Sequence, residues 1–307
     1  MQPALPIRVL TGPTAAGKTR LALELAESAG CEIVSMDSMA VYRRMDIGTA
    51  KPDAAALARI PHHLCDVADP GETFDAHRFC ELADRAVAEI RARGREPLFV
   101  GGTPLYMMAF FKGMIEGPTA DPEFRAALER RERETPGCLH AELGVVDPAA
   151  ADRIHRNDLR RIVRALEVLH QTGKPISEQQ TTFEAESWRV PCRIVALSRD
   201  REELHSRVRA RTIEMLERGL VEEVRSILDD AGFSNTSSAA IGYRECIDFL
   251  RGRYKDLEEL RNRIRRSTHK LIRRQTTWLR HLGPQVRWVS PDAPLEDLID
   301  AFESPRC

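Results

Sequence analysis

A phosphate-binding loop near the N-terminus is the feature that most constrains how this chain can fold. The stretch VLTGPTAAGKTRLALELA, residues 9–26, fits the pattern G-x-x-x-x-G-K-[ST] at Gly12, Gly17, Lys18 and Thr19. An apolar run precedes the loop and a helical pattern follows it. Because N–H groups at the start of a helix attract phosphate oxygens, the stretch predicts a strand, a loop and a helix that bind phosphate. It leaves open which phosphate compound is bound.

Short apolar runs separated by helical patterns predict the fold class. We expect buried strands at Ile7–Leu10, Glu32–Ser35, Leu98–Val100 and Ile194–Leu197, and helices that include Arg20–Ser28 and Phe79–Arg93. This alternation predicts an α/β fold with a doubly wound parallel sheet. We expect a phosphate-loop core from residues 1–119 and 190–307, which ends in a basic helical part. A mainly helical insertion domain is expected over 120–189, where Arg, Glu and Ala recur at helical spacing.

Composition excludes several classes of protein. The chain is 42% hydrophobic and 30% charged, as is typical of a soluble globular protein. No apolar run approaches the ~20 residues that span a bilayer, so we expect no membrane association. The seven cysteines form no C-x-x-C pair and the N-terminus has no secretory signal pattern. We therefore expect a cytoplasmic protein with reduced thiols, and a monomer.

The segment at 251–282 carries an unusual local charge. The whole chain has a net charge of −1, whereas this segment holds eleven Arg or Lys residues and three acidic residues, a local charge of +8. Tyr254 and Trp278 lie among the basic residues. The segment favours a surface that binds a polyanion at least as strongly as it favours a solvated helix face.

One feature expected of an ATPase or a kinase is missing. Such proteins hold Mg²⁺ with the help of an acidic residue at the end of a later strand. The candidate strand at 98–100 instead ends in Gly101, Gly102 and Thr103. The two glycines allow either a close approach of the backbone to a ligand or simply a tight exit from the strand, and Thr103 offers a hydroxyl.

Asp37 is the acidic residue that is placed well for chemistry. It lies just past the second predicted strand, where the ends of parallel strands build a ligand crevice. A carboxylate beside a diphosphate is repelled unless it binds a metal or accepts a proton, so Asp37 is a metal ligand or a general base. The structural alternative is an aspartate in a turn or a helix cap.

The paired histidines His62 and His63 suggest a metal site, but their spacing does not suit one. Neighbouring side chains on an extended segment point to opposite faces, so the two rings do not easily share one ion. We expect a structural or substrate-lining role for them.

Two helical patterns present arginines at i, i+4 spacing. Arg160 and Arg164 share a face beside Arg161, which suits the backbone phosphates of a nucleic acid. Arg207 and Arg211 share a face in the same way and suit an anionic leaving group. A solvated helix face is the alternative for the first pair.

These stretches together resemble one family, the tRNA dimethylallyltransferases, also called tRNA isopentenyltransferases. The matching blocks are, in family order, GPTAAGKT, DSMAVY with DIGTAKP, PHHL with the DP that follows, GGT with LY, ADPEFR, NDLRRIVRALEV with TGKPIS, MLERGLVEEV, IGYRE and RRQTTWLR. The resemblance implies a transfer of the dimethylallyl group from dimethylallyl diphosphate to the exocyclic amine of adenosine 37 in tRNA, with release of diphosphate. It also explains the missing acid, because the loop then holds the donor's diphosphate and no nucleotide is hydrolysed.

The resemblance further implies roles for single residues. The donor diphosphate would be bound by Gly12, Thr14, Ala15, Ala16, Gly17, Lys18 and Thr19, with Mg²⁺ as the cofactor near Thr19. Asp37 would take the proton of the adenine amine and Thr103 would orient that amine or the bridging oxygen, while Lys18 and Arg211 stabilise the leaving group. The tRNA anticodon stem-loop would contact the insertion, the basic segment and Asp37, Ser38, Met39, Ala40, Thr103, Arg125, Arg160, Arg161, Ile162, Val163, Arg164, Ala240, Ile241, Gly242, Tyr243, Arg244 and Glu245.

The chain departs from the family pattern in places that concern tRNA contacts. Pro104 stands where the family usually has Gly, Ala40 stands for a usual Gln, and RSTHKLI at 266–272 lacks a usual Tyr-Ala pair. Proline removes an N–H group and restricts the residue before it to extended conformations. No C-terminal zinc-finger pattern is present, so we expect a bacterial-type enzyme.

Three alternative functions predict different substrates. An adenylate isopentenyltransferase would share the loop and the chemistry but modify AMP, ADP or ATP, which need neither the insertion nor the basic segment. A phosphate-loop kinase would consume ATP. An RNA-binding protein with an inactive transferase core would bind tRNA without modifying it.

Overall fold

The computed structural model describes residues 5–113, 117–118, 120–179 and 188–303, and the chain divides into two compact units. Met1–Phe111 together with Val190–Cys307 form the first, here called the core unit. Lys112–Arg189 form the second, here called the helical unit. The insertion predicted over 120–189 lies within the helical unit.

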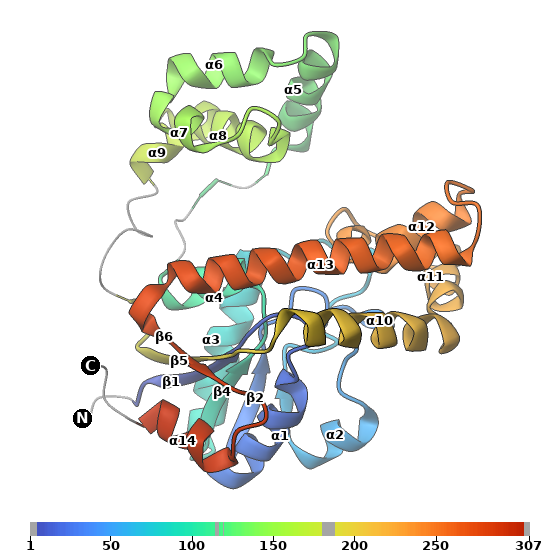
Figure 1. Cartoon of the computed structure of the whole chain (residues 1–307). Coiled ribbons are helices and arrows are strands. Elements are labelled where there is room, and N and C mark those ends of the chain that lie inside the picture. Colours follow the sequence, from blue (N-terminus) through green and yellow to red (C-terminus); the bar gives the residue numbers. More distant parts are fainter. Residues whose placement is uncertain (1–4, 114–116, 119, 180–187, 304–307) are drawn as a thin grey trace. The chain divides into compact units, whose positions relative to one another are not determined.

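The core unit is built on a six-stranded parallel sheet (Figure 1). Its strands are β1 (Ile7–Thr11), β2 (Cys31–Ser35), β3 (His62–His63), β4 (Glu96–Val100), β5 (Cys192–Leu197) and β6 (Val286–Val289), in the spatial order β3-β2-β4-β1-β5-β6. Every neighbouring pair is parallel. The predicted fold class and the four predicted strands are confirmed. The sequence did not predict β3, which has only two residues, or β6, whose sequence VRWV is interrupted by Arg287 and forms no continuous apolar run.

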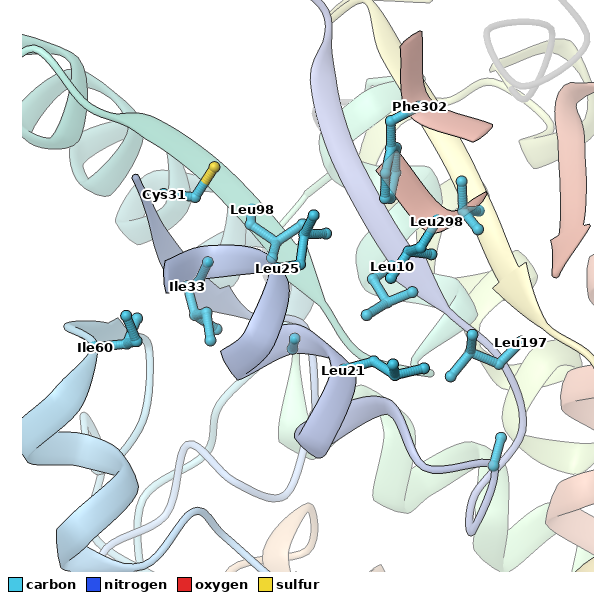
Figure 2. Close-up of a cluster of buried hydrophobic side chains, with 14 of the residues drawn as sticks. Leu10, Leu21, Leu25, Cys31, Ile33, Ile60, Leu98, Leu197, Leu298 and Phe302 are labelled. Carbon is cyan, nitrogen blue, oxygen red and sulfur yellow. The ribbon is translucent and has the colours of Figure 1, made fainter. Parts of the chain in front are cut away.

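Helices cover both faces of the sheet, as a doubly wound fold requires. On one face lie α1 (Lys18–Ala29) and α14 (Leu295–Glu303), and on the other lie α3 (Ala76–Ala92) and α4 (Pro104–Phe111). Figure 2 shows Leu25 of α1 and Phe302 of α14 in the buried cluster on the first face. On the second face, Phe99 of β4 stacks on Phe110 of α4 with 4.8 Å between ring centroids. Burial on both sides explains why the central strands read as continuous apolar runs.

The C-terminal half of the core unit is mainly helical. It contains α10 (Arg201–Glu217), α11 (Leu220–Asp229), α12 (Tyr243–Leu250) and α13 (Leu257–His281), with short 3₁₀ turns η2 (Ser237–Ala239) and η3 (Gly283–Gln285), while α2 (Ala54–Arg59) lies earlier in the chain. Helix α13 holds most of the basic segment and packs against α10 and α12 (Figure 1). Among the described residues, no helix combines the length and the apolar character needed to cross a membrane.

The helical unit has its own small core. Its helices are α5 (Pro122–Glu134), α6 (Cys138–Val146), α7 (Pro148–Arg153), α8 (Leu159–Thr172) and α9 (Ile176–Gln179). Leu128 of α5, Leu139 and Leu143 of α6, and Ile162 and Leu166 of α8 are buried together. The Asp121 side chain caps α5 by accepting from two of its first N–H groups, with Pro122 at the first helical position.

Candidate active site

The phosphate loop joins β1 to α1 at the carboxyl ends of the strands. Gly12 and Gly17 have φ angles of 138° and 99°, which glycine adopts without strain. Ala15 has a φ of 68° although it is not a glycine, and such costly conformations concentrate at functional sites. Helix α1 begins at Lys18, so the N–H groups of its first turn have no partner within the helix. The loop geometry therefore suits an anion.

Two amides of the loop have partners within the protein. The Thr14 N–H donates to Oε1 of Gln275 at 2.9 Å, and the Ala16 N–H donates to the Pro13 carbonyl at 3.2 Å. The predicted phosphate contacts of Thr14 and Ala16 stay predictions, but in this structure their amides already have protein partners. The amides of Gly17, Lys18 and Thr19 are the better candidates for phosphate donors.

Lys18 is a half-buried cation held against the loop. Its Nζ donates to the carbonyls of Gly12 at 3.0 Å and Pro13 at 2.9 Å. Burial lowers the pKa of Lys18 to about 8, with the nearby Asp37 charge opposing this effect and Arg211 adding to it. Because a nearby anion stabilises the charged ammonium, a phosphate bound here would raise the pKa of Lys18 again.

A cavity of about 690 Å³, here called the donor cavity, adjoins the loop and is lined by most of the predicted donor-site residues. Thr14, Ala15, Gly17, Lys18, Thr19, Asp37, Ala40, Arg207 and Arg211 all line it. Arg207 Nε donates to the Ala15 carbonyl at 2.9 Å, and Arg211 Nη2 donates to the Thr49 carbonyl at 3.4 Å. Burial lowers the pKa of Arg211, against the opposing charges of Asp37 and Glu214. The cavity thus combines a phosphate loop, cations and one carboxylate of the predicted set.

Asp37 follows β2 and combines a turn role with a place on the cavity wall. Its Oδ1 accepts the Met39 N–H at 2.9 Å, which fixes the direction of the carboxylate. Since Asp37 also lines the cavity, the turn interpretation and the chemical interpretation are compatible. A carboxylate so oriented is suited to accept a proton from a bound amine.

Gly101 and Gly102 are closely packed within the protein. A Cβ atom on Gly101 would lie 2.1 Å from the Met36 carbonyl oxygen, and one on Gly102 would lie 2.6 Å from Nε2 of Gln275. The first distance is to backbone, so a larger residue at position 101 would displace the strand exit, whereas the neighbour of Gly102 is the end of a flexible side chain. The tight exit accounts for Gly101, which also lines the cavity beside the phosphate loop, so close approach to a ligand is compatible with it.

Thr103 connects this exit to the segment that carries Asp37. Its Oγ1 accepts the Ser38 N–H at 3.0 Å. Pro104 is the first residue of α4, where an N–H group would have no helical partner, so the proline fits its position. Thr103 lines a second, small cavity together with Gln275 and Trp278 rather than the donor cavity itself.

Several residues at the site were not singled out from the sequence. Lys51 is nearly buried and forms ion pairs with Asp46 at 2.8 Å and Asp66 at 2.5 Å, which shapes the wall of the donor cavity. Arg199 lies in the same cavity, where it pairs with Asp292 at 3.0 Å. Lys51 and Gln275 fall within matched blocks, DIGTAKP and RRQTTWLR, which was the only signal for them.

The side chains of His62 and His63 lie in different surroundings, as predicted for neighbouring residues on an extended segment. His62 lines the donor cavity, while His63 Nε2 lies 2.7 Å from Oε2 of Glu32. Burial lowers the pKa of His62. Neither arrangement requires a metal ion.

The donor set beside the loop fits Mg²⁺. Over the part of the chain that the structure describes, no three His, Cys, Asp or Glu side chains gather into a metal cluster. Thr19, however, lines the donor cavity, and a hydroxyl oxygen is a ligand that Mg²⁺ accepts alongside water and phosphate oxygens. The chain thus offers the limited protein ligation that is usual for Mg²⁺ bound through a phosphate substrate.

The arginines predicted to contact tRNA in the helical unit divide into two pairs. Arg125 Nε and Nη2 bond both oxygens of the buried Glu167 at 2.7 Å, and Arg164 Nη1 bonds Oε2 at 2.6 Å. Arg160 and Arg161 are exposed. Although burial alone would raise the pKa of Glu167, these bonds and that of the Asp121 N–H lower it to about 2. The first pair therefore has a structural role, whereas in the second pair Arg161 lies on the surface 3.4 Å from Asp158.

Two predicted tRNA residues of α8 lie in the core instead. Ile162 is 1% exposed and Val163 is 4% exposed. Their side chains pack within the helical unit, so a contact of this stretch with RNA falls to the exposed arginines before them.

The IGYRE block has mainly buried members. Tyr243 Oη donates to Glu223 Oε1 at 2.5 Å and accepts the Gly48 N–H at 3.2 Å. Glu245 is 3% exposed and accepts hydrogen bonds from the Gly242 N–H and from Ser267. Ala240 is buried as well, whereas Ile241 is half-buried and Arg244 is exposed. In this structure the block holds segments of the core unit together, and the exposed Arg244 takes part, because its Nη2 pairs with Glu245 Oε1 at 2.6 Å.

Comparison with known proteins identifies one family. The family model described as IPP transferase matches residues 40–282. A tRNA dimethylallyltransferase of Anaeromyxobacter dehalogenans is 46% identical over 96% of this chain and 98% of its own, and one of Geobacter sulfurreducens is 43% identical over 94% and 93%. The solved tRNA isopentenylpyrophosphate transferase of Bacillus halodurans is 37% identical, with a TM-score of 0.68 over 96% of this chain and 93% of that one. A solved eukaryotic dimethylallyltransferase that acts on tRNA is 26% identical, with a TM-score of 0.76 over 98% of this chain and 77% of that one.

Proposed function

The chain belongs to the IPP transferase family, and from that premise we propose that it transfers a dimethylallyl group from dimethylallyl diphosphate to the exocyclic amine of adenosine 37 in tRNA. Its relatives are named tRNA dimethylallyltransferase and tRNA isopentenylpyrophosphate transferase, and this chain is a transferase that modifies tRNA by prenyl transfer. The donor, the modified position and the roles of single residues are our proposal.

One observation carries the proposal: the donor cavity joins a phosphate loop, two cations and the carboxylate of Asp37. At the end of β4, where a nucleotide hydrolase would have an acid, the chain has glycines that fit tightly against their neighbours. Such a cavity suits a diphosphate that leaves and an amine that loses a proton.

The protein's main contribution to the reaction is at the leaving group. As the bond from the allylic carbon to the diphosphate oxygen breaks, its electron pair stays on the diphosphate. Lys18 and Arg211, together with the amides that begin α1, stabilise that charge. When bound, Mg²⁺ neutralises further diphosphate charge, and Thr19 is the residue that would hold it.

Asp37 completes the transfer at the amine. The amine nitrogen of adenine forms the new bond to the allylic carbon and gives one proton to the Asp37 carboxylate. An aromatic amine is a weak nucleophile, so removal of this proton accompanies bond formation. Thr103 supports this side of the site, because its hydroxyl holds the Ser38 N–H beside Asp37.

Binding of tRNA must offset the cost of exposing the target base. Taking a base out of its stack costs roughly a few kcal/mol. Exposed arginines on α8 and α13, such as Arg160, Arg161 and Arg266, are suited to the backbone phosphates that supply this energy.

Labelled donor tests the proposal directly. Purified protein is incubated with labelled dimethylallyl diphosphate, Mg²⁺ and either tRNA or AMP, with and without ATP. We expect label on tRNA, one diphosphate released per label, and no consumption of ATP. Label on AMP but none on tRNA would support an adenylate isopentenyltransferase, and phosphoryl transfer from ATP without label would support a kinase.

A variant of Asp37, the proposed general base, separates transfer from tRNA binding. Asp37→Ala should abolish transfer and keep tRNA affinity within several-fold of the wild type. Wild-type protein that binds tRNA but transfers no label would indicate an inactive transferase core.

A further inference from the structure

Gln275 is an unusual residue for its helix. It lies within the basic segment of α13, yet it is neutral and only 6% exposed. The other residues that this fully described helix buries are Leu260, Ile264, Ile272 and Leu279, all apolar. A buried amide among them must satisfy its hydrogen bonds elsewhere in the protein.

The Gln275 amide bridges two loops at the reaction site. Its Oε1 accepts the Thr14 N–H at 2.9 Å, and its Nε2 donates to the Gly102 carbonyl at 2.8 Å. One side chain thus joins the phosphate loop to the loop that follows β4. Thr14 is 261 positions away in the sequence and Gly102 is 173 positions away, so α13 supplies a link that neither loop makes by itself.

The amide of Gln275 lies close to the backbone of both loops. A Cβ atom on Gly102 would lie 2.6 Å from Nε2 of Gln275 and 3.1 Å from the Gly12 carbonyl oxygen. That same carbonyl accepts the Lys18 ammonium at 3.0 Å. The two loops therefore lie close together at Gln275, and the Gly12 carbonyl beside them accepts a hydrogen bond from Lys18.

Each end of the bridge leads to a group that the proposed reaction uses. On one side, Thr14 belongs to the loop that presents Lys18 and the first amides of α1. On the other, Gly102 precedes Thr103, whose hydroxyl accepts the Ser38 N–H at 3.0 Å beside Asp37. The bridge thus connects the loop proposed to hold the leaving group with the segment next to Asp37.

We infer that Gln275 is a positioning residue, which holds the phosphate loop and the Thr103 side at the separation that transfer requires. It does so without touching the substrates, and the inference rests on the proposed function. At neutral pH an amide side chain meets the need at this length, because it both donates and accepts. A carboxylate only accepts, and an apolar side chain does neither.

Two variants separate the hydrogen bonds from the packing. Gln275→Met keeps a similar length but leaves the Thr14 N–H and the Gly102 carbonyl without a partner. Gln275→Glu keeps the acceptor, but an ionised carboxylate opposes the Gly102 carbonyl. The protonated acid has both a donor and an acceptor, so acid pH should restore the bridge.

The surroundings favour a protonated acid at this position. The small cavity beside Gln275 is lined by the uncharged residues Thr11, Met36, Gly102, Thr103, Pro104, Met107, Trp278 and Leu279. Positive charges oppose protonation: Lys18 bonds the Gly12 carbonyl on the adjoining loop, and the exposed Arg273 and Arg274 precede Gln275 on α13. Burial among the uncharged residues raises the pKa of a carboxyl group.

The test measures diphosphate affinity and the transfer rate separately. Affinity for inorganic diphosphate comes from titration calorimetry, and the rate from single turnovers at saturating donor and tRNA. For Gln275→Met we expect diphosphate affinity to fall about tenfold and the rate to fall about a hundredfold, because misplaced reactants lose most of the benefit of orientation. For Gln275→Glu we expect similar losses at about pH 8 and a recovery relative to the wild type towards about pH 6. Affinity for tRNA should stay unchanged in both.

Gln285 offers matched controls. It lies in η3, outside both cavities, and Gln285→Met and Gln285→Glu should match the wild type in every measurement. Unchanged diphosphate affinity and rate in Gln275→Met, with only a lower Tm, would overturn the inference, as would a Gln275→Glu variant that does not recover at acid pH. If the wild type bound diphosphate but transferred nothing, the proposed function would fail, while the diphosphate affinities would still decide whether Gln275 shapes the loop.

Discussion

The core unit and the helical unit use their basic residues in opposite ways. In the core unit, Lys18 and Arg211 lie in the donor cavity, where burial lowers the pKa of each. In the helical unit, Arg160 and Arg161 are exposed on α8. A partly buried cation acts strongly on a charge beside it because the local dielectric is low, whereas an exposed one is screened by salt. The comparison predicts that the first pair controls the rate of transfer and the second controls tRNA affinity.

Arg125 and Arg164 show a third use of basic residues, which is structural. Both bond the carboxylate of Glu167, which is 0% exposed. A buried charge needs such partners, and removing one of them is costly. These two arginines are therefore poor choices for testing RNA contacts, since replacing them should also weaken the fold of the helical unit.

The largest effect is expected in the donor cavity, from Asp37→Asn. Asparagine keeps the size of the side chain but takes up no proton, so the single-turnover rate should fall about 10³-fold, within the usual range for a general base. Affinity for tRNA should change little. Full activity in this variant would show that Asp37 is not the base.

Arg211→Gln should have the next largest effect. It removes a buried positive charge from the leaving-group side, so kcat should fall by about 10²–10³ while the tRNA KM stays the same. Arg209→Gln on the same helix is the control, because Arg209 is exposed and does not line the cavity. Equal losses in the two variants would refute a special role for the buried position.

In the helical unit, Glu167→Gln should act on stability rather than on chemistry. Leaving two arginines without their buried partner should lower the free energy of unfolding by about 3 kcal/mol, as measured by urea denaturation. The folded pKa of Glu167 is about 2, below its usual value of 4.5, so this contribution is present above pH 4.5 and is lost as the pH falls towards 2. A variant as stable as the wild type at neutral pH would contradict the structural role.

Arg160→Ala combined with Arg161→Ala should weaken tRNA binding about tenfold, as expected for two lost phosphate contacts. The slope of log K against log salt concentration should become less steep by about one to two. The rate at saturating tRNA should remain that of the wild type. A lower rate with unchanged affinity would reverse the comparison between the two units.

The smallest effect concerns pH and Lys18. Below pH 8 its ammonium is already charged, and above pH 8 diphosphate must bind together with a proton. Affinity for diphosphate should therefore fall about threefold between about pH 7.5 and about pH 8.5, since the pKa of Lys18 is about 8. Lys18→Arg stays charged in this range, so it controls for titration of the ligand. A parallel fall in both proteins would show that Lys18 does not titrate there.

The sequence predicted the parts of the site that local pattern determines. The strand, loop and helix over residues 7–29 follow from one motif, and the position of Asp37 follows from the end of β2. It did not predict the Gln275 bridge, because its partners lie 261 and 173 positions away. No local pattern reports such distant pairs.

The helical unit shows a different limit of sequence reasoning. Spacing of i, i+4 placed Arg160 and Arg164 on one face, yet Arg164 bonds Glu167 and Arg160 is exposed. Helical periodicity indicates which residues are neighbours, but not which neighbour is a buried acid. Burial also decided the outcome for Ile162 and Val163, whose side chains belong to the core.

Mass spectrometry of tRNA nucleosides tests the central claim, that the loop holds the diphosphate of an isoprenoid donor for transfer to tRNA. Unmodified tRNA is incubated with dimethylallyl diphosphate and Mg²⁺, without ATP, and either wild-type protein or Asp37→Asn. We expect dimethylallyl-adenosine at position 37 with the wild type and almost none with the variant. Unmodified tRNA with the wild type, or modification that requires ATP, would contradict this account.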